Sequence, residues 1–329
     1  MSSPRFLGDS EADIGLAAQT LARGELLGLP TETVYGLAGD ALNDRAVAAI
    51  FKAKGRPADH PLIVHLASSA QVPVFASLVP AAAKALMQAL WPGPLTLILP
   101  RRPGVGDATA GGHATVALRC PSHPMAQQVL QHALTLGVQG VAAPSANLFG
   151  RVSPTTAQHV RLAFKDLTVM DGGACEVGIE STIVDLSRGT PVLLRPGMLT
   201  LAQLSAACGT QVLAASAPAA SASAPAAPGT LASHYAPSAR VRLMRGEEMA
   251  ARWQTAPPSR TAVWLRSPLS VPPGLRCVPM PADAAECAHD LFARLRELDA
   301  AGVDEIWVET PPDGPLWDGV RDRLLRASA

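Results

Sequence analysis

The chain has 329 residues, about twice the length of a common domain, so we expect one large domain and a smaller one. Hydrophobic residues make up 48% and charged residues 16%, which provides a core and excludes a disordered chain, a collagen and a coiled coil. Lys and Arg together number 27, as do Asp and Glu, so the net charge is zero and an anionic partner must be bound by a local site.

Three stretches in the N-terminal part have the periodicity of amphipathic helices. Ser10 is the predicted N-cap of the first, which Gly24 ends. The second covers residues 44–54 and is ended by Gly55. The third covers residues 81–90 and stops at a turn rich in Pro and Gly.

Short apolar runs between these helices predict strands. They cover residues 25–30, 62–66, 95–99, 115–119, 141–143, 167–170, 182–186 and 192–194. No helix lies between 95–99 and 115–119, so these two strands either pair antiparallel or lie apart. The sequence therefore predicts a large α/β domain around a mixed sheet, which differs from a plain doubly wound one.

A linker follows this domain. Every residue from Ala214 to Pro228 is Ala, Ser or Pro, a composition without bulky side chains to bury and with prolines that interrupt helices. The predicted boundaries are residues 1–207 for the large domain, 208–238 for the linker and 239–329 for a small domain.

The small C-terminal domain is also predicted to be α/β. Strand patterns lie near residues 241–243, 262–265 and 306–309, and helical patterns cover 284–298 and 317–326. Alternation of these elements indicates helices packed on a small sheet.

The cysteines and the N-terminus bear on the compartment. Five cysteines are scattered without a CxxC pair or a Cys/His cluster at metal spacing, so we expect reduced thiols: Cys120, Cys175, Cys208, Cys277 and Cys287. Charged residues between Arg5 and Asp13 take the place of an apolar signal segment, and no run of about 18 apolar residues follows. These features predict a cytoplasmic protein without a membrane partner.

The motifs of common nucleotide-binding proteins and hydrolases are absent. The sequence has no GxxxxGK[ST] loop, no GxGxxG after a strand, no HExxH and no GxSxG. Four polar clusters stand out instead, at residues 30–37, 54–61, 115–119 and 143–150. Open α/β sheets gather their ligand groups where strands run into turns, so these clusters are candidate parts of one site.

The first two clusters combine hydroxyl, carboxylate and cationic groups. Residues 30–37 read PTETVYGL and form either a ligand loop or an ordinary polar turn. In the second cluster, Lys54 interacts either with a ligand or with the dipole of the helix that it ends. The backbone of Arg56 is restricted by a neighbouring glycine and proline, which suits a donor directed at phosphate or carboxylate oxygens. His65, in the next strand, is either a ligand contact or a buried core histidine.

The last two clusters extend the candidate site. Thr115 and Arg119 share one face of a strand, and Arg119 is either an anion clamp or a surface strand end. Residues 143–150 read APSANLFG and permit close approach of the backbone to a ligand, or form a turn and helix cap. With residues 178–182 and Arg195, the clusters supply three arginines and a lysine but no activated nucleophile. Such a set favours phosphoryl or nucleotidyl transfer, in which a protein mainly positions reactants and stabilises charge.

The order of these motifs resembles a known family. The chain contains, in this order, the runs PTETVYGL, KGRPADHPLIVH, PSANLFGRVSPT, GIESTIVD and LRPG. These runs are similar to motifs of the YrdC-type threonylcarbamoyl-AMP synthases. The later run PGTLASHYAP is similar to the two-domain form of that family. The similarity covers about residues 11–204 and, more loosely, the C-terminal domain. It implies a YrdC-like domain with a twisted mixed sheet flanked by helices, and a small Rossmann-like α/β domain.

The resemblance also implies a reaction. L-Threonine, bicarbonate and ATP would give L-threonylcarbamoyl-AMP and pyrophosphate, and a separate transferase complex would use the product to modify tRNA next to the anticodon. Mg²⁺ is implied as the counterion of ATP, with no protein metal site. Weak binding of tRNA or other double-stranded RNA is a further implication.

Roles for individual residues follow from the matching motif positions. Lys54 and Arg56 are the implied catalytic residues, with Lys54 neutralising phosphate charge. The implied threonine contacts are Thr33, His65, Arg119, the Ala143 backbone and Ser181. The implied ATP contacts are Arg56, His60, Thr115, Ser145, Asn147, Ser153, Arg195 and Tyr235. Because Tyr235 would fold back over the nucleotide, residues 208–238 are expected to act as a lid.

Two positions depart from the family pattern, and two other functions remain open. His60 stands where a small polar residue is more common, and Phe149 replaces a serine. A nonenzymatic RNA-binding module would show salt-dependent RNA affinity without ATP turnover. Transfer of carbamoyl from carbamoyl phosphate is the other alternative, although related proteins of that kind carry acylphosphatase and zinc-finger regions that this chain lacks.

Overall fold

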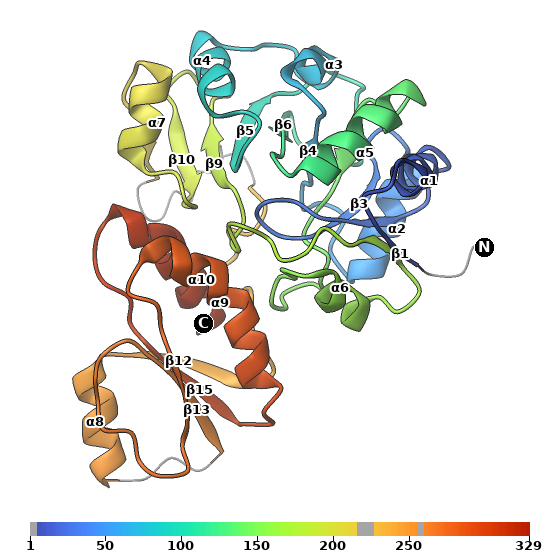
Figure 1. Ribbon diagram of the computed structural model, residues 1–329. Coiled ribbons are helices and arrows are strands. Elements are labelled where there is room, and N and C mark those ends of the chain that lie inside the picture. The colour runs from blue at the N-terminus through green and yellow to red at the C-terminus, as the bar shows by residue number, and fades with distance from the viewer. Residues whose placement is uncertain (1–4, 216–226, 256–259) are drawn as a thin grey trace.

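The computed structural model describes residues 5–215, 227–255 and 260–329. Within these residues, an 11-stranded sheet forms the centre of the N-terminal domain and a four-stranded sheet the centre of the C-terminal domain (Figure 1). Both sheets carry helices on their faces, which confirms the predicted α/β fold with a second, smaller α/β domain.

The large sheet is mixed. Its strands are β1 (Phe6–Leu7), β2 (Leu27–Leu29), β3 (Gly36–Asp40), β4 (Ile63–His65), β5 (Leu95–Pro100), β6 (Thr115–Arg119), β7 (Val141–Ala142), β8 (Thr168–Met170), β9 (Thr182–Asp185), β10 (Val192–Arg195) and β11 (Leu213–Ala214), in the order β1-β8-β2-β3-β7-β4-β6-β5-β9-β10-β11. β5 pairs antiparallel with β6 and parallel with β9. The antiparallel alternative for 95–99 and 115–119 is therefore the one that the chain adopts.

Three strands of this sheet go beyond the predicted set: β1 and β11 at its two edges, and β3 within it. β3 pairs antiparallel with β2, so the motif at residues 30–37 is the loop of a hairpin and its last residues belong to a strand. β3 reads GLAGD, without the β-branched and aromatic residues that usually mark strands. Burial between neighbouring strands, which is a tertiary effect, makes this segment a strand.

The helices of the N-terminal domain are α1 (Glu11–Ala22), α2 (Asp44–Lys54), α3 (Val72–Phe75), α4 (Ala81–Leu90), α5 (Pro124–Thr135), α6 (Ala157–Ala163) and α7 (Leu201–Cys208). The three predicted helices among them, α1, α2 and α4, begin and end close to the predicted signals, and the structure adds four further helices among the described residues. The Ser10 hydroxyl accepts a hydrogen bond from the Asp13 amide at 3.2 Å, as expected of an N-cap. Gly55 ends α2 with φ +63°, a left-handed conformation that glycine adopts without a steric penalty.

The helices cover the sheet unevenly. Side chains of α1 and α5 pack with one face, whereas α2, α3, α4, α6 and α7 pack with the other. On the α1/α5 face, the neighbouring strands β4, β6, β5 and β9 carry a separate small apolar cluster instead, which the segment after residue 226 contacts through Ala227. This strip of the sheet forms the floor of the candidate site described below.

The C-terminal domain has a parallel sheet. Its elements are β12 (Arg240–Met244), α8 (Gly246–Thr255), β13 (Thr261–Leu265), β14 (Arg276–Pro279), α9 (Ala284–Asp299), β15 (Glu305–Glu309) and α10 (Asp318–Ala327), with strand order β12-β15-β13-β14. α8 packs on one face, and α9 and α10 pack on the other (Figure 1). Strand β14 adds to the three predicted strands.

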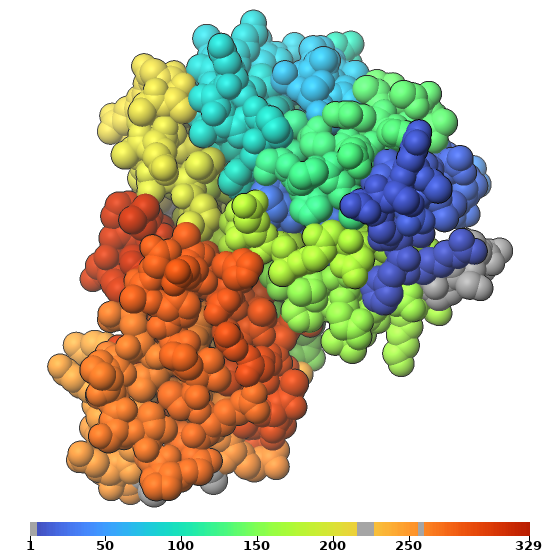
Figure 2. Space-filling view, viewed as in Figure 1, coloured from blue at the N-terminus to red at the C-terminus, as the bar shows by residue number. Residues whose placement is uncertain are grey.

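The two domains share a hydrophobic core. Val34, Val152 and Ile179 of the first domain cluster with α9, α10 and the strands of the second. α9 and α10 lie between the small sheet and the larger domain, and the space-filling view shows the domains in broad contact (Figure 2). Part of the predicted linker, residues 216–226, lies outside the described residues, so its boundaries stay a prediction.

Two features of residues 5–215, 227–255 and 260–329 concern membranes and metal ions. No helix there combines the length and the apolar character needed to cross a bilayer. Within the same residues, no three His, Cys, Asp or Glu side chains are grouped closely enough to hold a metal ion.

Candidate active site

Strand register brings polar side chains together on the open strip of the sheet. His65 on β4 pairs with Arg119 on β6, and Arg119 pairs with Thr96 on β5. Because paired residues of neighbouring strands point to the same face, these three side chains form one polar row. The hydroxyl of Thr96 lies 2.7 Å from that of Ser181, which extends the row toward β9.

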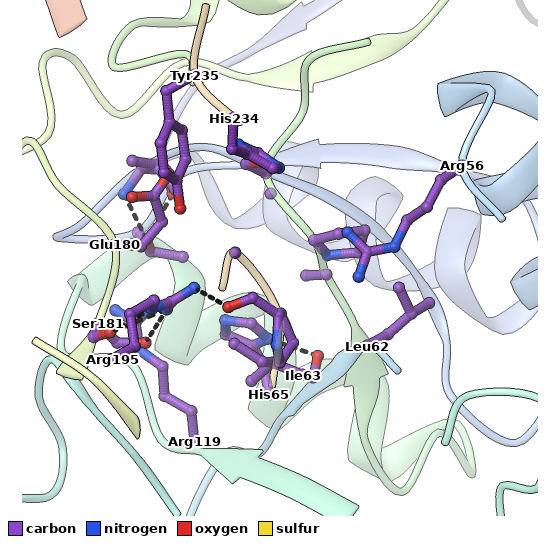
Figure 3. A pocket seen from close by; sticks show the side chains of 18 residues that line it. Arg56, Leu62, Ile63, His65, Arg119, Glu180, Ser181, Arg195, His234 and Tyr235 are labelled. Carbon is purple, nitrogen blue, oxygen red and sulfur yellow. Dashed lines mark hydrogen bonds between the residues drawn. The ribbon is translucent and has the colours of Figure 1, made fainter. Parts of the chain in front are cut away.

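Arg56, Arg119 and Arg195 line a single pocket above this row. It has about 560 Å³ of empty space, part of it open to solvent. Figure 3 shows Arg56 on one side, and Arg119 and Arg195 on the opposite side. The three guanidinium groups come from the loop after α2, from β6 and from β10, so only the fold brings them to one place.

Arg119 is held by the hairpin loop between β2 and β3. Its Nη2 atom lies 2.8 Å from Oε1 of Glu32, and Nη1 donates a hydrogen bond of 2.8 Å to the hydroxyl of Thr33. Both charged side chains are at least 96% buried. The position of this guanidinium is therefore determined by a buried ion pair and a neutral hydroxyl.

Arg195 is fixed by the segment that precedes β9. Its Nε and Nη2 donate to the carbonyl of Ser181 at 3.0 and 2.9 Å, and Nη2 also contacts the Ser181 hydroxyl at 3.1 Å. Nη1 donates to the carbonyl of Pro228 at 2.7 Å. Burial lowers the pKa of Arg195 to about 10, so the group keeps its positive charge at neutral pH.

Arg56 approaches from the other side of the pocket. One guanidinium nitrogen donates to the carbonyl of Pro61 at 3.0 Å, and the group lies 5.7 Å from the centre of the Phe149 ring. Nε of Arg56 is buried without a hydrogen-bond partner among the described residues. Burial, and then repulsion from Arg195, lower the pKa of Arg56 to about 10. A half-buried cation with an unused buried donor is suited to an anionic ligand.

The loops at residues 30–37 and 143–150 are joined by backbone hydrogen bonds. The Leu37 amide donates to the carbonyl of Pro144, and the Ala146 amide donates to that of Tyr35. A Cβ on Gly36 would lie 2.9 Å from that of Ala143, so this close approach requires glycine. As a result, Ala143 and Ser145 both line the pocket.

His65 lies at the floor of the pocket. Its Nδ1 is 3.2 Å from the carbonyl of Ile63. Burial, and then the charge of Arg119, lower the pKa of His65 to about 3. The imidazole is therefore neutral at physiological pH and offers one donor and one acceptor.

Several of the predicted residues do not line the pocket. The ammonium group of Lys54 donates to the carbonyls of Ser145 and Asn147, and burial lowers its pKa well below the usual value. Thr33 and Ser153 hold side chains that line the pocket. The Thr33 hydroxyl accepts a hydrogen bond from Arg119, and the Ser153 hydroxyl donates one of 2.5 Å to the Glu180 carboxylate. The remaining predicted residues outside the pocket lining are Thr115 at the start of β6, Asn147 in an adjoining groove and His60 in a hollow next to Arg56.

The segment after residue 226 forms the roof. Pro228, Gly229, His234 and Tyr235 line the pocket from this side. Aromatic rings from both domains contact this segment. The ring centroids of Phe149 and His234 are 6.0 Å apart, and those of Tyr235 and Phe292 of α9 are 5.3 Å apart. Burial, then the charge of Glu180, raise the pKa of Tyr235 to about 12, so its hydroxyl remains neutral.

Three residues of the site, two carboxylates and a histidine, were not assigned a role from the sequence. Glu180 and His234 line the pocket, and Glu32 holds Arg119. Each is part of a motif quoted for the resemblance, so its position was visible. The direction in which each side chain points could not be predicted, because a motif specifies neither the strand register nor the partner of a carboxylate.

Comparisons with known proteins agree with this architecture. Residues 19–197 match the Sua5/YciO/YrdC family model, described as telomere recombination, and residues 199–329 match the model of the threonylcarbamoyl-AMP synthase C-terminal domain. The chain is 39% identical to the threonylcarbamoyl-AMP synthase of Pyrococcus abyssi, covering 97% of this chain and 94% of that protein.

This chain belongs to the threonylcarbamoyl-AMP synthase family. The family member from Bacillus subtilis is 35% identical, over 98% of this chain and 94% of that protein. The crystal structure of Pyrococcus abyssi Sua5 in complex with L-threonine superposes with a TM-score of 0.88 at 37% identity, covering 98% of this chain and 97% of that one. The coverage includes both domains, so the chain has the two-domain form of the family that its motifs resemble.

Proposed function

We propose that this chain makes L-threonylcarbamoyl-AMP from L-threonine, bicarbonate and ATP, with release of pyrophosphate. The observation that carries the proposal is the convergence of three arginines in one pocket, two of them buried and one half-buried, on a chain whose near full-length relatives are threonylcarbamoyl-AMP synthases. Two substrates bring anionic groups, a triphosphate and a carboxylate, and fixed guanidinium groups are suited to both.

The floor of the pocket is the proposed threonine subsite. Arg119 would bind the carboxylate, because Glu32 and Thr33 fix its guanidinium where it lines the pocket, and its Nε has no hydrogen-bond partner among the described residues. Neutral His65, Ser181 and the Ala143 backbone surround the same space and offer uncharged contacts to the amine and hydroxyl of the substrate. Pyrococcus abyssi Sua5 binds L-threonine, and we infer the same ligand here.

The triphosphate is proposed to lie between Arg56 and Arg195. These cations face the pocket from opposite sides (Figure 3). Ser145 also lines the pocket. Other predicted ATP contacts, His60 and Tyr235, lie at the roof and its edge. Lys54 would act through the loop at residues 145–147, whose carbonyls it holds, and not through direct contact with phosphate.

The chemistry needs orientation, charge stabilisation and exclusion of water. The threonine amine adds to bicarbonate with loss of water to form a carbamate, and a carbamate oxygen then attacks the α-phosphorus while the bond to pyrophosphate breaks. Arg56 and Arg195 would stabilise the charge on the leaving pyrophosphate. The roof formed by residues 227–235 would shield the carbamate, which decomposes readily in water.

Mg²⁺ is proposed to enter with ATP. The pocket donors are mainly guanidinium groups, which fit phosphate oxygens, and its carboxylate Glu180 is already paired with Arg323 and hydrogen-bonded by Ser153. These residues fit a nucleotide whose metal is held by phosphates and water. The ion would supply neutralisation of phosphate charge.

We further propose that the product is passed to a tRNA-modifying transferase complex in the cytoplasm. Threonylcarbamoyl-AMP is a mixed anhydride, so the next reaction must be an acyl transfer to a nucleophile such as the amino group of an adenosine. Weak binding of tRNA remains part of this proposal, with an affinity that falls as salt concentration rises.

Product analysis provides the direct test. The purified chain is incubated with labelled bicarbonate, L-threonine and Mg-ATP, and mass spectrometry should detect labelled threonylcarbamoyl-AMP together with pyrophosphate. Arg56→Ala should abolish turnover, whereas Arg45→Ala, at an exposed position of α2, should not change it. RNA binding without ATP turnover would favour the binding module, and a product made only from carbamoyl phosphate would favour carbamoyl transfer.

A further inference from the structure

Arg323 of the C-terminal domain reaches into the wall of the pocket. It lies on α10 and its side chain is completely buried. Nε donates to the Glu180 carboxylate at 2.7 Å, Nη2 to the Glu180 carbonyl at 3.2 Å, and Nη1 to the Pro196 carbonyl at 3.0 Å. Three nitrogens of one guanidinium thus hold two segments of the other domain, a task that the single ammonium of lysine cannot reproduce.

The groups that Arg323 holds are directly connected to the site. Glu180 lines the pocket and precedes Ser181, whose carbonyl and hydroxyl accept hydrogen bonds from Arg195. Pro196 follows Arg195 in the chain. The C-terminal domain therefore contacts both neighbours of the Ser181–Arg195 pair.

Charge gives this arrangement a second consequence. Glu180 is buried close to a pocket that must accept phosphates, and Arg195 is another cation near it. Burial alone would raise the pKa of Glu180, but the charges of Arg323 and Arg195 lower it. Without Arg323, the carboxylate would compete for Arg195, the guanidinium that ATP needs.

We propose that Arg323 is a positioning residue of the active site, through which the C-terminal domain orients Glu180 and leaves Arg195 available for ATP. This inference rests on the proposed function. It assigns the second domain a direct part in building the nucleotide site. A purely structural ion pair between domains would affect only the stability of the fold.

The test compares two substitutions on the same helix. Arg323→Met removes the guanidinium and keeps the apolar stem. Arg321→Met is the matched control, because the partners of Arg321 are Pro312, Asp313 and Asp318, all within the C-terminal domain. The full-length variants are assayed at a temperature at which circular dichroism shows both to be folded.

We expect Arg323→Met to lower kcat/KM for ATP by roughly tenfold to a hundredfold, as is usual when a substrate-binding group is misplaced. Affinity for a nonhydrolysable ATP analogue, measured by calorimetry, should fall in parallel. Arg321→Met should leave both values unchanged. Equal kinetics and affinity in Arg323→Met and the wild type would overturn the inference.

Two further variants separate charge from folding. Arg323→Met/Glu180→Gln removes the unpaired carboxylate, so it should fold even if the single variant does not, and should recover most of the ATP affinity. Arg323→Lys should give an intermediate affinity. If the double variant binds ATP no better than folded Arg323→Met, the competition between Glu180 and ATP for Arg195 is refuted.

The outcomes also separate this inference from the proposed function. If the wild type makes no threonylcarbamoyl-AMP but Arg323→Met still weakens binding of the ATP analogue, the proposed function fails and the positioning role stands. If the wild type is active and Arg323→Met retains its ATP affinity, the proposed function stands and the positioning role fails.

Discussion

Each buried cation of the pocket has a protein partner that fixes its direction. Arg119 is paired with Glu32, and Arg195 is bonded to Ser181 and Pro228. A buried charge without such a partner is costly, so the partners are as important to the site as the arginines themselves. Substitutions at this scale therefore affect both binding and stability, and the two must be measured separately.

Arg119 should determine the affinity for threonine. Arg119→Met leaves Glu32 buried without a cation and is expected to destabilise the fold by about 3–5 kcal/mol. Arg119→Met/Glu32→Gln removes that penalty but still lacks the carboxylate clamp. Steady-state kinetics of this double variant should show a threonine KM raised by roughly tenfold or more, with a smaller change in the KM for ATP. An unchanged threonine KM would place the carboxylate elsewhere.

His65 makes stability depend on pH. Its pKa is about 3 in the folded protein and about 6.5 in an unfolded chain. Between these values the unfolded state binds a proton that the native state does not, so stability falls as pH decreases from 6.5 toward 3. The expected loss is about 1.4 kcal/mol per pH unit. Denaturant unfolding at several pH values should show a shallower dependence for His65→Gln; equal slopes would contradict this assignment.

Helix α10 is placed by close contact as well as by Arg323. Gly319 lies in α10 against the other domain, and a Cβ there would be 2.7 Å from the carbonyl oxygen of Gly197 and 2.8 Å from Cδ1 of Ile179. Gly15 lies in α1 and has nothing within 4 Å of its Cβ position. Both glycines are helical, but an added Cβ would meet close neighbours at Gly319 and open space at Gly15.

Substitution of these glycines by alanine should have opposite effects. Gly15→Ala should stabilise the protein by roughly 0.5–1 kcal/mol through helix propensity. Gly319→Ala gains the same term but must move α10 away from Gly197, so we expect a net loss of about 1–3 kcal/mol. Chemical denaturation gives both values. A stabilised Gly319→Ala would show that the domains accept a wider separation.

The two domains are joined by a shared core and by the roof segment. The core cluster that contains Val34, Val152 and Ile179 is completed by α9 and α10, and the roof segment lies between the domains. Removing the second domain would expose these apolar residues to water and release the roof from Phe292 and Arg323.

A chain that ends at residue 215 should therefore be less stable and less active. We expect a lower melting temperature, stronger binding of a hydrophobic dye and at least a tenfold loss of kcat/KM, because the truncated chain lacks Arg323 and the roof. Differential scanning calorimetry and the product assay measure these effects against the full chain. Equal values for both would mean that the second domain has no part in the site.

Local patterns in the sequence were sufficient for much of the fold. Helix signals depend on neighbours a few residues away, as at the cap at Ser10, the stop at Gly55 and the periodic stretches 44–54 and 81–90. The structure has these helices at the predicted positions. The motifs also led to the correct family. The short strand β3 was not recognisable, since its glycines and alanine carry no strand signal by themselves.

Only the tertiary structure decided which charged groups share a pocket. Strand order brings Arg119 and Arg195 together, and the ammonium of Lys54 turns to loop carbonyls that lie 91 and 93 residues later in the chain. The pair of Arg323 and Glu180 spans 143 residues and two domains. A sequence pattern records which side chains are available, whereas their partners depend on long-range packing that no local periodicity contains.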